Sequence, residues 1–131
     1  MQNKAFFLKR LNDHVQYLRQ MKARLDGHNQ FEPTSCRICA LGEWLYGEGM
    51  KYASEHSEVM LNLFHALLEP HERFHAASEE ALRCQQAGDE LGMRRALTEM
   101  HTLSTTLINI LLKMDGIPAH SVDDSNAVKR H

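Results

Sequence analysis

The segment His71–His75 reads His-Glu-Arg-Phe-His and carries two imidazoles and a carboxylate at a spacing suited to metal chemistry. On an α-helix, residues four positions apart lie on one face, so His71 and His75 could bind the same ion. With Glu72 as general base, the segment would have the signature of a zinc protease. Alternatively, the two histidines are ordinary ligands and Glu72 takes no part. The segment alone allows both an enzyme and a sensor.

A second stretch with metal-binding chemistry begins at Cys39 and reads Cys-Ala-Leu-Gly-Glu-Trp. Leu41, Trp44 and Leu45 are spaced to share one helix face, and Gly42 would let a neighbouring helix approach closely. Burial of that face would press Cys39 toward the core. At a helix start, unpaired amides and the helix dipole favour the thiolate, which is the form that binds metals and reacts with oxidants.

His14 is the only polar member of an apolar stripe with heptad spacing on the first predicted helix. Taken alone, such a residue is more often a core histidine bonded to a backbone carbonyl than a ligand. With Cys39, His71 and His75, it completes a set of three imidazoles and one thiolate, which suits four-coordinate zinc. Such a set is closed, whereas catalytic zinc keeps a position open for water or substrate.

The apolar pattern predicts an all-α fold with three long helices and no strands, because no segment alternates and β-branched residues are sparse. The first helix is expected at residues 7–25 and the last at residues 90–114. Helical periodicity at residues 54–86 is interrupted by Pro70, which predicts a kink or a new helix start just before His71. Breaking that helix gives four rods, so we expect an antiparallel four-helix-type bundle.

A short inserted helix at residues 39–46 is expected to carry the cysteine ligand. Thr34 and Ser35 are its candidate caps, and the Gly47–Gly49 segment is its candidate terminator. The chain has 131 residues, and we expect one zinc-binding bundle domain at residues 1–115 followed by a flexible tail at residues 116–131.

Composition argues against several classes of partner. Fifteen basic and seventeen acidic residues nearly balance, and no basic run marks a nucleic-acid site. The first apolar run, Ala5–Leu8, is too short for a signal peptide, and later apolar runs fall far short of the roughly 20 residues that span a membrane. Three cysteines without an export signal favour reduced thiols. We therefore expect a cytoplasmic protein with no membrane insertion.

Three motifs together resemble the bacterial chemoreceptor zinc-binding (CZB) domain family: His14-x-x-Tyr17, Cys39-x-Leu41-Gly42-x-Trp44 and His71-x-x-x-His75. The likeness covers nearly the whole chain from His14 to the last helix. Its cysteine motif, followed by Tyr-Gly-Glu-Gly, is far more specific than a histidine pair alone. The resemblance implies a helical bundle, usually a homodimer, that holds zinc through His14, Cys39, His71 and His75, with Gly42 and Trp44 supporting the cysteine segment.

Members of the CZB family usually attach the domain to a chemoreceptor signalling region or a diguanylate cyclase, and they report zinc or hypochlorous acid through the cysteine. The resemblance therefore implies a non-enzymatic sensor in signal transduction, such as chemotaxis, that responds through Cys39. No output domain is recognisable in this sequence, so we expect a stand-alone domain that signals to a protein partner in trans.

Two other interpretations remain open at this point. The zinc hydrolase would be centred on His71, Glu72 and His75, but the Gly and His that continue the extended metalloprotease motif do not follow His75. The second interpretation is a zinc-binding bundle in which the metal has a purely structural role. Separately, Cys36 precedes Cys39 by three positions, and it could resolve an oxidised Cys39 by forming a disulfide.

Overall fold

The computed structural model describes residues 6–37 and 39–117, and these residues form five helices and no strand. The prediction of an all-α bundle is confirmed. The helices are α1 (Phe6–Leu25), α2 (Ala40–Leu45), α3 (Gly49–His56), α4 (Glu58–Gln86) and α5 (Glu90–Asp115). Apart from its first two residues, the expected tail at 116–131 lies outside the described residues. No described helix is long and apolar enough to cross a membrane.

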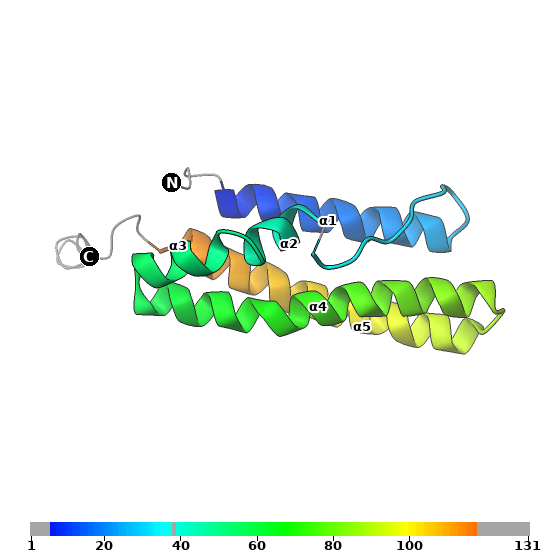
Figure 1. Ribbon diagram of the computed structural model, residues 1–131. Helices are drawn as coiled ribbons and strands as arrows, with labels where there is room; N and C mark the ends of the chain where they lie inside the picture. The colour runs from blue at the N-terminus through cyan, green and yellow to red at the C-terminus, as the bar shows by residue number, and fades with distance from the viewer. Residues whose placement is uncertain (1–5, 38, 118–131) are drawn as a thin grey trace.

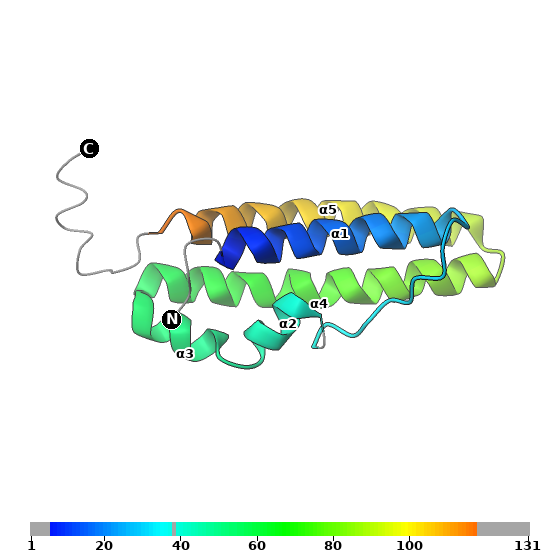
Figure 2. The same cartoon turned by 90° about the horizontal axis from the view of Figure 1, so that it is seen from above.

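Three long helices and one segment of two short helices make up the bundle. Figure 1 and Figure 2 show α1 and α4 running in one direction, while α5 and the α2–α3 segment run in the opposite one. Helix α4 packs along α5, α1 packs against α5, α3 lies on α4, and α2 contacts α1. The α2–α3 segment therefore occupies the fourth position of an antiparallel bundle, where it covers only part of the length of α4.

Pro70 lies inside α4, which continues without interruption from Glu58 to Gln86. The predicted new helix start before His71 is therefore wrong, and the fourth rod comes from the α2–α3 segment instead. A proline removes one backbone hydrogen bond and crowds the carbonyl one turn earlier, at a cost of about 3 kcal/mol. The packing of the long helix α4 against α5 outweighs this local cost.

The helix predicted from residue 54 begins at Glu58 because Ser57 interrupts it. The backbone of Ser57 is extended, and its Oγ accepts a hydrogen bond from the amide of Met60 at 3.0 Å, which makes Ser57 the N-cap of α4. The residues before it form the separate helix α3, which the sequence pattern did not indicate. This turn reverses the chain and lays α3 on α4.

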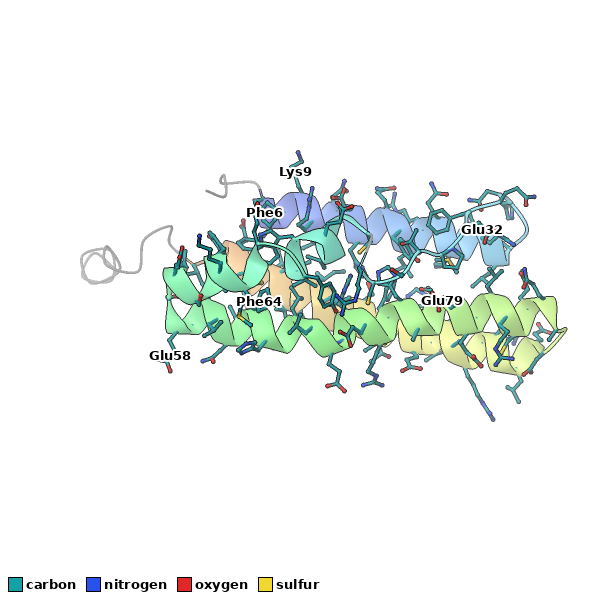
Figure 3. All side chains as sticks on the ribbon, in the orientation of Figure 1. Phe6, Lys9, Glu32, Glu58, Phe64 and Glu79 are labelled. Atoms are coloured by element: carbon teal, nitrogen blue, oxygen red, sulfur yellow. The ribbon has the colours of Figure 1, made fainter. Side chains whose placement is uncertain are left out.

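Apolar side chains from all five helices fill the interior (Figure 3). The largest fully buried ones are Met21, Met60, Phe64, Leu67, Phe74, Met100, Leu107, Leu111 and Met114. Five polar side chains of the described residues are also buried, namely His14, His71, His75, Ser78 and Ser104. Because a buried polar group is costly without a partner, the three histidines need hydrogen bonds or a metal inside this core.

Candidate metal centre

Three of the predicted ligands meet in the structure. One ligand atom from each of Cys39, His71 and His75 lies within 4.8 Å of the other two. The histidines lie one turn apart on α4 with their ring centroids 4.7 Å apart, and Sγ of Cys39 is 3.2 Å from Nε2 of His71. Both imidazoles are buried and Cys39 is partly buried. A pair on one helix and a thiol from a distant segment thus form one cluster.

Cys39 is held at the cluster because it begins helix α2. Its extended backbone makes it the N-cap, and its Sγ accepts a hydrogen bond from the amide of Gly42 at 3.2 Å. The candidate caps Thr34 and Ser35 do not cap α2, because the chain is still irregular at these positions and the thiol performs this role. The same sulfur atom therefore caps the N-terminus of α2 and lies next to His71.

Helix α2 is attached to the bundle through three buried apolar residues, Leu41, Trp44 and Leu45. Trp44 is the largest of them, and its ring packs against Phe6 of α1 and Phe64 of α4 at centroid distances of 5.2 and 5.8 Å. Trp44 thus supports the cysteine segment by joining it to two long helices.

Gly42 makes a close backbone contact, although not with a neighbouring helix as the sequence suggested. A Cβ atom at Gly42 would lie 1.6 Å from the carbonyl oxygen of Cys36. The turn that precedes α2 therefore folds back directly over the helix, which only a glycine at this position permits. The contact fixes the turn that leads into Cys39.

His75 is oriented by a backbone carbonyl. Its Nδ1 donates to the carbonyl oxygen of Thr34 at 2.8 Å, which leaves the lone pair of Nε2 for a metal. Nδ1 of His71 is buried without a hydrogen-bond partner among the described residues. Two imidazoles and one thiol at these distances are a donor set that zinc prefers. The residues present therefore fit a zinc ion.

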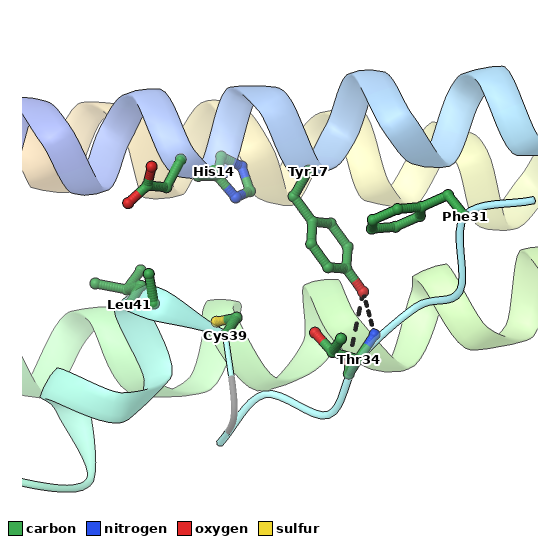
Figure 4. Close-up of a pocket in the computed structure, with 8 residues that line it drawn as sticks. His14, Tyr17, Phe31, Thr34, Cys39 and Leu41 are labelled. Atoms are coloured by element: carbon green, nitrogen blue, oxygen red, sulfur yellow. Dashed lines mark hydrogen bonds between the residues drawn. The ribbon is translucent and has the colours of Figure 1, made fainter. Parts of the chain in front are cut away.

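His14 lies beside the cluster and is not part of it. Its Nε2 is 2.9 Å from Oγ of Ser104 on α5, and its ring packs edge-on against Phe74 at 4.5 Å. His14 and Cys39 both line a cavity of about 220 Å³ between α1 and the start of α2 (Figure 4). The structure thus brings three of the four predicted ligands together and places the fourth next to them.

Burial favours the neutral form of the two imidazoles in the cluster and of His14 beside it. It lowers the pKa of His14 to about 4 and that of His71 to about 3, with a smaller contribution from the neighbouring histidines, and it also lowers the pKa of His75. The neutral imidazole is the form that binds a metal. At neutral pH all three histidines are therefore available as ligands.

Burial raises the pKa of the Cys39 thiol, and hydrogen bonds from the amides of Gly42 and Leu41 offset this only in part. The expected stabilisation of a thiolate by the helix start is therefore outweighed by desolvation. A metal cation held by Cys39, His71 and His75 would supply positive charge that favours the thiolate form of Cys39.

Glu72 is not one of the clustered ligand groups. Its carboxylate, which is exposed, accepts a hydrogen bond from the hydroxyl of Tyr46 at 2.5 Å, at the C-terminal end of α2. Burial, followed by this hydrogen bond, raises the pKa of Tyr46. The carboxylate that would be the base of a protease is thus engaged in anchoring α2 to α4.

We expect Glu72→Gln to leave zinc affinity within about twofold of the wild type, because the amide oxygen can still accept the Tyr46 hydrogen bond. Glu72→Ala removes that acceptor, and we expect it to weaken zinc binding more than Gln does by loosening α2. Competition with a chromophoric chelator measures both. A loss of zinc in Glu72→Gln comparable to that caused by removing a ligand would contradict this assignment.

Cys36 lies close to the same contacts. Its Sγ is 3.9 Å from the Tyr46 hydroxyl, and its carbonyl oxygen accepts a weak hydrogen bond from Sγ of Cys39 at 3.7 Å. Cys36, Cys39 and Cys84 are all free thiols in the structure. The two thiols at the start of α2 therefore belong to one turn.

The model of the protein family described as "Chemoreceptor zinc-binding domain" (CZB) matches residues 14–82. The matched stretch is more than half of the chain, and it begins at His14 and includes Cys39, His71 and His75. The chain therefore belongs to the CZB family of zinc-binding domains. Neither the comparison with curated proteins nor the comparison with solved structures gives a match.

Proposed function

We propose that this chain is a zinc-binding regulatory sensor domain without enzymatic activity. The main support is that ligand atoms of Cys39, His71 and His75 lie within 4.8 Å of one another and that all three fall inside the residues that match the CZB family. His14 is the fourth ligand in our proposal, through the Nδ1 lone pair that remains when its Nε2–H donates to Ser104. Zinc bound by these four residues would hold Cys39 as a thiolate and leave no position for a substrate.

Release of α2 is the output that we propose. This helix has six residues, far fewer than the roughly 12 that a helix needs to be even marginally stable alone, so its order depends on its attachments. One attachment is the apolar face of α2, a second is the hydrogen bond from Tyr46 to Glu72, and a third is Cys39 in the metal cluster. Loss of the ion would remove the third attachment and loosen α2, and the altered surface would then be available to a signalling partner in trans.

Oxidation of Cys39 is the second trigger that we propose. Hypochlorous acid converts a thiolate to a sulfenic acid and releases chloride, with two electrons passing from sulfur to chlorine. Condensation with the Cys36 thiol would then form a disulfide and release water. The position of Cys36 in the same turn supports this step. The three free thiols fit a reducing compartment, and we propose the bacterial cytoplasm.

We further propose that the domain forms a homodimer, as the family resemblance implies. Leu8 on α1 and Leu112 on α5 are 46% and 48% exposed, although these helices pack against each other in the bundle. Both leucines would add apolar area to an interface if a second copy covered these helices. No nucleic-acid or membrane partner is part of the proposal.

Hydrogen exchange on the zinc-loaded and the chelator-treated protein tests this function. We expect one zinc per chain by metal analysis, and removal of zinc should accelerate amide exchange in α2 by on the order of tenfold or more while the middle of α5 stays protected. Treatment with hypochlorous acid should have the same effect. Zinc binding without any change in α2, helicity or dimerisation would favour a purely structural site, and peptidase activity abolished by Glu72→Gln would favour the hydrolase.

A further inference from the structure

The orientation of His75 depends on a segment without regular structure. Its Nδ1 donates to the carbonyl oxygen of Thr34, which lies in the irregular connection between α1 and α2. A carbonyl in such a connection is not fixed by helical hydrogen bonds, so something else must hold it in place. The orientation of the His75 ring therefore depends on how firmly the Thr34 carbonyl is held.

The hydroxyl of Tyr17 on α1 holds Thr34. It accepts a hydrogen bond from the amide of Thr34 at 2.8 Å and donates to the carbonyl oxygen of the same residue at 3.4 Å (Figure 4). A single hydroxyl thus contacts both backbone groups of Thr34. The carbonyl oxygen has two lone pairs, so it can accept from Tyr17 and His75 at once.

The ring of Tyr17 also confines the imidazole directly. Its centroid is 4.8 Å from that of His75 in an edge-to-face arrangement, and it packs similarly against Phe31 at 5.1 Å and Phe74 at 5.8 Å. The ring and the hydroxyl therefore act on the same ligand by separate contacts. Replacement by phenylalanine would remove one of them and keep the other.

We infer that Tyr17 is a positioning residue of the metal centre, whose hydroxyl fixes the Thr34 carbonyl and thereby presents Nε2 of His75 to the ion shared with Cys39 and His71. The inference rests on the proposed zinc function. A ligating histidine normally donates its second ring N–H to such a partner, and loss of this support typically lowers metal affinity by about 10- to 100-fold. In this protein the partner of His75 is the Thr34 carbonyl, and Tyr17 on α1 in turn holds that carbonyl in place.

Tyr17→Phe tests the inference because it deletes the hydroxyl and preserves the aromatic packing. We expect zinc affinity to fall by on the order of tenfold or more in chelator competition, and the absorption bands of the Co²⁺-substituted protein to shift as the ligand geometry relaxes. Tyr52→Phe is the matched control, since Tyr52 packs against Trp44 and its hydroxyl has no hydrogen bond among the described residues. It should bind zinc like the wild type.

Nitrogen-15 NMR of the histidine rings in the metal-free proteins separates this inference from the zinc function. In the wild type, His75 should carry its proton on Nδ1, and in Tyr17→Phe the two tautomers should mix. Wild-type affinity together with an unchanged tautomer in Tyr17→Phe would overturn the role of Tyr17 and leave the zinc function standing. A wild type that binds no zinc would overturn the proposed function and the role of Tyr17 at a metal, whatever tautomer His75 adopts.

Discussion

Replacing Cys39 with serine is expected to lower zinc affinity by more than about 100-fold, while residue 39 still caps the N-terminus of α2. The sulfur has two roles, because it caps the helix through the amide of Gly42 and faces Nε2 of His71. A serine hydroxyl caps a helix at least as well as a thiol does, but it is a poor ligand for zinc. Serine therefore separates the two roles, whereas alanine would remove both.

Chelator competition and metal analysis of purified Cys39→Ser measure the loss, and circular dichroism with thermal unfolding shows whether the bundle persists. Cys84→Ala is the control for the loss of a thiol, because Cys84 lies roughly 13 Å further along α4 than His75 and contacts Glu80. It should keep the zinc content of the wild type. If Cys39→Ser also binds zinc like the wild type, the cysteine is no ligand and the proposed sensor mechanism fails.

The residue pattern predicts those parts of the centre that depend on local spacing. His71 and His75 share a helix face because they are four residues apart, and this holds whether or not the helix breaks at Pro70. Cys39 comes to the core because Leu41, Trp44 and Leu45 form a buried face behind it. The long helices are also predicted by local pattern, because their apolar spacing is visible in the sequence. Gly88, which has a positive φ of 77°, lies in the short connection between α4 and α5.

Contacts between distant segments have no such local signal. The partner of His75 is the backbone carbonyl of Thr34, and a carbonyl has no residue type to recognise. Ser104 meets His14 from 90 residues away, on a helix face where a serine has no distinctive pattern. The continuity of α4 through Pro70 depends on packing against α5, which outweighs the local preference of proline.

Replacing Gly42 with alanine is expected to change the geometry of the metal centre, although Gly42 is not a ligand. A Cβ atom there would lie 1.6 Å from the carbonyl oxygen of Cys36 and 3.1 Å from Cα of Arg37. Both are backbone atoms, so no side-chain rotation can relieve the overlap. Either the turn before α2 moves or α2 itself does, and each movement displaces Cys39 from His71.

We expect Gly42→Ala to lower the free energy of unfolding by about 2 kcal/mol, within the range of about 1–3 kcal/mol for overpacked sites, and to weaken zinc binding by on the order of 100-fold. Denaturant unfolding of the metal-free protein and chelator competition measure these effects separately. Gly116→Ala is the control, because a Cβ atom there meets its nearest neighbours at an ordinary 3.6 Å. If Gly42→Ala loses stability but keeps its zinc affinity, the turn at Cys36 contributes to the fold and does not position the ligand.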